Sequence, residues 1–265
     1  MCSSDLLSWL GLPQRRTHVL PPDSHQTPFG DEFDYAILET IDLGPGQFAE
    51  VAFFHRRSRT LLVTDSIISI PLAPPPILEL ESYPLLFHAK DRSSDSLIDT
   101  PANRLKGWQR ICLFALYFQP SSLEIINWSK SFQASFTAPD RSRQNYFGLY
   151  PFQWRSDWQQ GFTHLHEDSQ LLVAPILQRL ILNRAPKPTI EWVDRVSQWD
   201  FEQIIPCHFD APIAATPHQF RMAFNFLECR HLTDLELPTA DFRLLQQIEQ
   251  RLTQWRIIIP AQNKV

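Results

Sequence analysis

Residues 49–71 read AEVAFFHRRSRTLLVTDSIISIP, and the fold prediction starts from this stretch. Two apolar runs, Val51–Phe54 and Leu61–Val63, flank a basic segment at Arg56–Arg59. β-Branched and aromatic residues favour strands, and a polar break of this length suits a hairpin turn. The second run ends at Thr64-Asp65, so the pattern predicts a carboxylate at the edge of a sheet.

Two apolar runs of this stretch, Leu61–Val63 and Ile67–Ile70, are apolar at consecutive positions. Strands with this pattern are typically buried on both faces, whereas half-exposed strands alternate. A later run, Phe201–Pro206, is the next strong strand candidate, and Tyr35–Leu38 is a shorter one. Helical patterns separate these strands, and this alternation predicts an α/β fold.

The predicted helices begin at recognisable caps. Thr100-Pro101 predicts a helix start, and the pattern continues to about Phe118. Ser121 or Ser122 can cap a second helix through Phe132. Residues 240–256 are the most regular amphipathic pattern. Their inward positions are expected to be Phe242, Leu245, Ile248, Leu252 and Trp255.

Composition excludes several functional classes. The chain has 265 residues, 7 of them glycine, and no GxGxxG or GxxxxGK[ST] pattern, which argues against a phosphate-binding loop. The net charge is −5 and no basic stripe indicates nucleic acid. The 4 cysteines include no CxxC pair, which favours free thiols in a reducing compartment. No apolar run approaches the roughly 20 residues of a membrane helix, so we expect a soluble, cytoplasmic protein without a membrane partner.

Two fragments carry a resemblance to a known superfamily. An apolar strand that closes on Asp65 resembles the metallo-β-lactamase-like superfamily, with Thr64 in place of the usual glycine. The fragment Ile204–His208 resembles the late Pro-Gly-His strand of that superfamily, with Cys207 in place of glycine. The resemblance implies part of an αββα sandwich, the later portion of it.

At closer range the chain resembles domain of unknown function family 4336, which is found mostly in cyanobacteria and organisms with chloroplasts. The segments that carry this resemblance are Leu62–Ser69, Tyr83–Asp91, Asp99–Phe118, Tyr146–Trp154, Leu172–Pro186 and Trp199–Pro217. The activity of this family is unknown, so the resemblance implies a fold and leaves the function open.

The superfamily resemblance implies that Asp65 and His208 lie together and could hold a metal ion, with Zn or Fe as the alternatives. Asp210 and His88 are candidates to support such a site. Two ligands are too few for a catalytic zinc, which uses three protein ligands and water. The superfamily's early HxHxDH cluster has no counterpart in residues 1–48, and its middle histidine aligns with Gly46 or Gln47.

The leading interpretation is therefore a degenerate, non-catalytic member with a structural or interaction role and no cofactor. In that case Asp65 and His208 would bond to each other or to nearby backbone. The alternative is a metal-dependent hydrolase of unknown substrate. Cys207 precedes His208, and strand alternation predicts that it faces the core.

The sequence His164-Leu165-His166-Glu167-Asp168 also spells HxHxD. It falls on a predicted helix, where residues two apart point about 200° apart around the axis. We therefore expect surface histidines there.

The predicted organisation is an extended lead-in over residues 1–34, an α/β domain over 35–230, and a C-terminal helix over 238–258. The resemblance begins partway through the sandwich, so the chain looks incomplete at its N-terminus, and one face of the sheet would lack a cover. A second chain, an upstream segment or the helix at 240–256 could cover that face.

Overall fold

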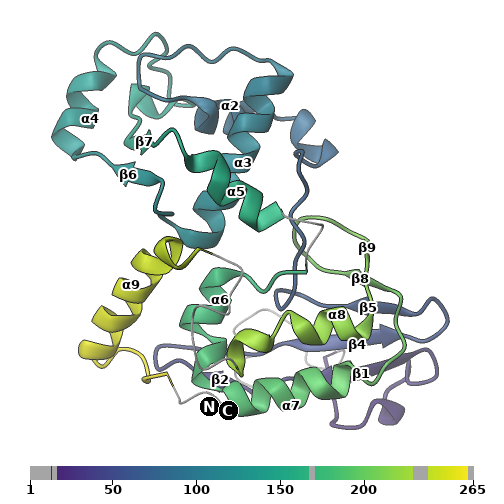
Figure 1. Cartoon of the computed structure of the whole chain (residues 1–265). Helices are drawn as coiled ribbons and strands as arrows, with labels where there is room; N and C mark the ends of the chain where they lie inside the picture. The colour runs from purple at the N-terminus through teal and green to yellow at the C-terminus, as the bar shows by residue number, and fades with distance from the viewer. Residues whose placement is uncertain (1–12, 14–16, 167–170, 229–237, 262–265) are drawn as a thin grey trace.

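The hairpin around the basic segment lies in the middle of a five-stranded mixed sheet (Figure 1). The structure, a computed structural model, describes residue 13 and residues 17–166, 171–228 and 238–261. The strand order is β1-β4-β5-β8-β9; β5 and β8 pair parallel and the other neighbours antiparallel. The strands are β1 Phe33–Ile37, β4 Val51–His55, β5 Thr60–Leu62, β8 Gln203–Ile205 and β9 Ile213–Ala214.

Helices and two small ribbons make up the rest of the described chain. The ribbons pair β2 Ile41–Asp42 with β3 Gln47–Phe48, and β6 Leu123–Ile125 with β7 Phe152–Trp154. The α-helices are α2 Tyr83–Ala89, α3 Pro101–Tyr117, α4 Trp128–Ser135, α5 Trp158–His166, α6 Pro175–Leu180, α7 Pro186–Val196, α8 Pro217–Met222 and α9 Arg243–Gln254. Short 3-10 turns are η2 Ser24–Gln26, η3 Pro76–Glu79, η4 Tyr146–Gly148, η6 Leu182–Arg184, η7 Asn225–Leu227 and η9 Thr239–Phe242. These elements confirm a mixed α/β fold.

One face of the sheet, the inner face, is closed by helices α7 and α8. The strand register lines up Phe54, Leu61, Ile204 and Ile213 across the sheet, and all four are buried. Trp192 of α7 is fully buried, and its indole N–H donates to the carbonyl of Ala36 in β1 at 2.9 Å. This face therefore forms the main core beneath the sheet.

The opposite, outer face has a thinner cover. The same register lines up Tyr35, Phe53, Leu62 and Ile205 on it. Phe29 from the lead-in packs against the first two rings, with centroids 6.5 and 6.2 Å away. Phe53 and Leu62 remain partly exposed, and Ile205 is 39% exposed. The expectation of one poorly covered sheet face therefore agrees with the structure.

A helical lobe, residues 83–166, is inserted between β5 and α6, and it lies to one side of the sheet (Figure 1). Within this lobe, helices α2 and α3 pack closely against each other at Gly107. A Cβ added there would lie 1.8 Å from the carbonyl oxygen of Leu85. Thr100 caps α3 as expected, because its hydroxyl accepts from the backbone N–H of Asn103. Among the described helices, none combines the length and apolar character that a bilayer crossing requires.

The C-terminal helix α9 packs on α6 and does not cover the outer face (Figure 1). Leu245 is fully buried, whereas Trp255, which was expected to point inward, is 68% exposed. Buried Glu249 lies 2.7 Å from the Arg179 guanidinium and 3.6 Å from that of Arg184. The helical pattern was predicted correctly, but its docking partner was not, because amphipathicity does not specify which surface a helix meets.

Two local predictions were wrong. Ile67–Ile70 is buried but is not a strand: Ile68 makes a single bridge to Leu172, and the rest is irregular. The segment after Ser121 forms strand β6, and helix α4 begins only after Asn127, whose side chain caps it. At β6, pairing with β7 outweighs the local helical pattern.

Candidate functional site

Strands β5 and β8 bring Asp65 and His208 to the same edge of the sheet. Leu62 pairs with Ile205 in the parallel ladder, and the pairing continues beyond both strands. The N–H of Cys207 donates to the carbonyl of Thr64 at 3.3 Å. Parallel strands end at the same edge of a sheet. The residues that follow Thr64 and Cys207 are Asp65 and His208, so their side chains reach the same place at that edge.

The two side chains meet there directly. His208 Nε2 lies 2.9 Å from Asp65 Oδ1, and the side chains are 61% and 42% exposed. This is the proximity expected from the resemblance. A pair this exposed contributes only about 0–1 kcal/mol to stability, so its position at the sheet edge is not explained by a large stabilising effect.

Glu50 holds the backbone beneath this pair. Its side chain is 2% exposed, and its carboxylate accepts the N–H groups of Thr64 at 2.7 Å and Asp65 at 3.1 Å. Burial raises the pKa of the Glu50 carboxyl above its ordinary value, and the two N–H donors oppose that rise. Sequence reasoning missed this residue. The available signal was a lone carboxylate directly before an apolar strand. A carboxylate buried at such a position needs hydrogen-bond partners.

The side chains of Asp65 and His208 are at a hydrogen-bond distance from each other. Two tetrahedral zinc ligands with bonds of about 2.05 Å would be about 3.3 Å apart, whereas the observed 2.9 Å is a hydrogen-bond distance. Within the described residues, no group of three or more His, Cys, Asp or Glu side chains is placed to hold a metal. Gly46 and Gln47, at the position of the superfamily's middle histidine, are exposed in the β2–β3 hairpin.

Cys207 and Asp210 do not complete the site. Cys207 was expected to face the core, but it is exposed beside His208, because β8 ends at Ile205 and strand alternation no longer applies. Asp210 is also exposed, and its backbone N–H donates to the carbonyl of Ser69 at 3.3 Å. The carboxylate that pairs with His208 is that of Asp65.

The HxHxD sequence lies at the end of helix α5, as predicted. His164 Nδ1 bonds the carbonyl of Gln160 at 2.6 Å, and His166 Nδ1 bonds the carbonyl of Ile70 at 2.7 Å. Glu167 and Asp168 lie outside the described residues. Each imidazole therefore forms a hydrogen bond with a different backbone carbonyl.

His88 lies in the helical lobe on α2, away from the Asp65–His208 pair. Its ring packs among the aromatic rings of Phe87, Phe114 and Phe152, with centroids 5.4–6.0 Å away. Burial lowers the pKa of His88 to about 4, and the charge of Arg110 acts in the same direction. The sequence suggested His88 as a support for the metal site, and the structure assigns it to a different region.

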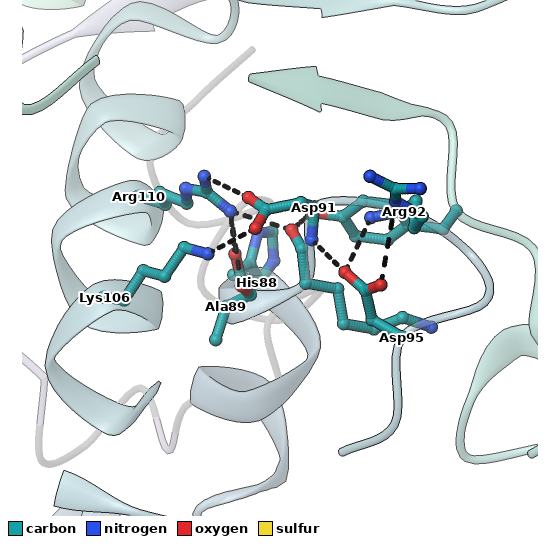
Figure 2. A network of polar contacts seen from close by, with 9 residues as sticks. His88, Ala89, Asp91, Arg92, Asp95, Lys106 and Arg110 are labelled. Atoms are coloured by element: carbon teal, nitrogen blue, oxygen red, sulfur yellow. Dashed lines mark hydrogen bonds and ion pairs between the residues drawn. The ribbon is translucent and has the colours of Figure 1, made fainter. Parts of the chain in front are cut away.

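A buried arginine organises the chain next to His88 (Figure 2). The Arg110 guanidinium donates to the carbonyl of Lys90 at 2.8 Å and to the Asp91 carboxylate at 2.7 Å. It also packs against the indole rings of Trp154 and Trp158, at 5.1 and 4.8 Å. Arg110 therefore closes the C-terminal end of α2, where free carbonyls favour a cation.

Comparison with known proteins agrees with the resemblance at the level of the family. Residues 4–226 match the family described as Domain of unknown function (DUF4336). No curated protein and no solved structure matches the chain. Because the match includes both site strands and the whole helical lobe, the chain belongs to the DUF4336 family.

Proposed function

We propose that this protein is a degenerate, non-catalytic relative of the metallo-β-lactamase-like superfamily, with a structural or interaction role. The observation that carries the proposal is the direct contact between Asp65 Oδ1 and His208 Nε2 at 2.9 Å. His208 Nε2 and Asp65 Oδ1, each of which could bind a metal, are thereby engaged with each other. Glu50, the nearest buried carboxylate, is occupied by two backbone N–H groups.

The superfamily relationship is supported by the strand arrangement. The apolar strands β5 and β8 are parallel neighbours, and Asp65 and His208, three residues beyond the end of each strand, meet at one edge. The partial αββα sandwich is part of the same proposal. In the described residues the sheet has helices on its inner face and only the lead-in on its outer face.

Metal analysis of protein purified without chelator tests the non-catalytic assignment. We expect no stoichiometric Zn or Fe after dialysis, since the described part of the chain offers only two adjoining ligands. His208→Ala removes one of them, and His164→Ala is the matched control, because that partly exposed histidine lies on helix α5. Stoichiometric metal that is lost in His208→Ala and kept in His164→Ala would contradict the proposal.

The alternative is a metal-dependent hydrolase, and one observation favours it. Asp65 and His208 are both exposed at a sheet edge, so an ion could reach them from solvent. Such an ion would supply a bound hydroxide as nucleophile. The two side chains would then have to rotate apart to about the 3.3 Å of a ligand pair.

The interaction role is supported by the outer face of the sheet. Its row of Phe53, Leu62 and Ile205 leaves apolar surface in water, and a partner that covered these partly exposed side chains would gain a fraction of the about 1.5–3 kcal/mol that full burial of each contributes. We propose that a second copy of the chain packs on this face. Sedimentation velocity over a range of concentrations should show self-association that Ile205→Ser weakens. Leu80→Ser, which changes an 83% exposed residue outside the sheet, should leave it unchanged.

A further inference from the structure

A surface pocket with no connection to the Asp65–His208 pair opens in the helical lobe. Helix α2 contributes Tyr83, Phe87 and His88 to its wall, and the segment leading into η4 contributes Arg143, Gln144 and Tyr146. Its volume of about 570 Å³ falls in the range of small-molecule sites. Figure 2 shows His88, one of the lining residues, beside Arg110, whose guanidinium donates to the carbonyl of His88 at 3.3 Å.

The lining combines aromatic walls with one cation. The rings of Phe87 and Tyr146 lie with centroids 4.9 Å apart, and His88 is a neutral ring at physiological pH because burial lowers its pKa to about 4. Arg143 is exposed at the rim, and no carboxylate lines the pocket among the described residues. Aromatic faces bind planar rings, and a guanidinium binds a carboxylate in a bidentate fashion.

Two buried polar atoms of the lining lack a partner. Within the described part of the chain, the Tyr83 hydroxyl and His88 Nδ1 make no hydrogen bond. Buried polar groups are nearly always bonded, so these two atoms can accept a hydrogen bond from a ligand or donate one to it if it reaches them. A hydroxyl group on a bound ring could serve either atom after a small ring rotation.

The backbone of the pocket's rim is held in an unusual conformation. Tyr146 and Phe147 have φ values of 47° and 58°, which bulky residues rarely adopt, yet both side chains are about 60% exposed. Two backbone hydrogen bonds hold the turn. The N–H of Phe147 donates to the carbonyl of Ser142 at 2.9 Å, and the N–H of Gly148 donates to the carbonyl of Asn145 at 2.8 Å. Such conformations concentrate at binding sites, where they hold a side chain in place before the ligand arrives.

We propose that this pocket binds a small planar aromatic carboxylate. The carboxylate pairs with Arg143, the ring lies against Phe87 and Tyr146, and a ring hydroxyl bonds Tyr83 or His88. The inference is independent of the function proposed above, because it uses none of the residues at the sheet edge.

Calorimetric titration with 4-hydroxycinnamate tests the proposal. The wild-type protein should bind it saturably at millimolar concentration or below. Arg143→Gln should weaken binding about tenfold or more, which corresponds to about 1.4 kcal/mol. Arg141→Gln is the matched control, because Arg141 lies two residues away, packs over Phe136 and is absent from the pocket lining.

Two further ligands separate the contributions of the carboxylate and the hydroxyl. The neutral amide of 4-hydroxycinnamate should bind as weakly to the wild type as the acid binds to Arg143→Gln. Cinnamate, which lacks the hydroxyl, should bind more weakly than 4-hydroxycinnamate. Unchanged thermal unfolding of both arginine variants shows that they fold. The proposal is overturned if the wild type shows no saturable binding, if both arginine variants lose affinity equally, or if acid and amide bind alike.

Discussion

Replacing His88 with phenylalanine should make the protein less sensitive to mild acid. The imidazole is enclosed by the rings of Phe87, Phe114 and Phe152, so a phenyl ring suits the same surroundings. Burial lowers the pKa of His88 to about 4 in the folded protein, and nearby Arg110 adds to this effect. In the unfolded chain a histidine has a pKa of about 6.5.

The sign and size follow from these two pKa values. Between about pH 6.5 and 4, the unfolded chain binds a proton at His88 that the folded protein does not, so stability falls as the pH falls. The full effect is about 3 kcal/mol, since each pKa unit corresponds to about 1.4 kcal/mol. About 2 kcal/mol of it is lost between pH 7.5 and pH 5.

Urea unfolding at these two pH values measures the effect. The wild type should lose about 2 kcal/mol more of its unfolding free energy than His88→Phe over this interval. His164→Gln changes a partly exposed histidine and should follow the wild type. His88→Leu provides a second variant if the phenyl ring does not fit. Equal losses in the wild type and both His88 variants would refute the buried, neutral imidazole.

Two other predictions concern a contact within the helical lobe and a contact between that lobe and the C-terminal segment. Gly107→Ala should lower stability by about 3 kcal/mol, since its Cβ would meet the carbonyl of Leu85 at 1.8 Å. Gly46→Ala, which meets nothing within 4 Å, should not, and equal thermal midpoints for the two variants would show that the helices do not approach so closely. Asp241→Ala should cost about 1–3 kcal/mol in chemical unfolding, because Asp241 Oδ1 accepts from the backbone N–H of Ser121 at 2.7 Å and from its hydroxyl at 2.5 Å. A loss of only a few tenths would mean that this carboxylate is not a structural anchor.

The elements that could be predicted from the sequence are those set by local chemistry. The hairpin around Arg56–Arg59 and the Thr100 cap of α3 follow from turn and cap preferences, and both are present. Strand β6 could not be predicted this way, because Leu123–Ile125 is extended only through its pairing with Phe152–Trp154. The period of three and four residues at positions 240–256 identified α9 but not its partner α6.

The candidate site, too, could be predicted from the sequence only in part. The resemblance placed Asp65 and His208 together, and the structure has them 2.9 Å apart. It also grouped His88 with them, although α2 carries that residue into the helical lobe. Glu50 and Arg110 were missed because a buried charged residue can be recognised only when its partners are known. Those partners are backbone groups or side chains that lie far away in the sequence.

The position of α9 means that the family's shared segment does not by itself cover all of the core in this protein. The match to the family ends at residue 226, whereas Leu245, which is fully buried, belongs to the main hydrophobic core. A chain shortened to residue 226 would uncover that core and leave Arg184, whose side chain is 1% exposed, without the Glu249 carboxylate. Relatives that lack such a helix must therefore close the surface of α6 differently, and a swap of domains between family members should carry residues 238–258 along with α6.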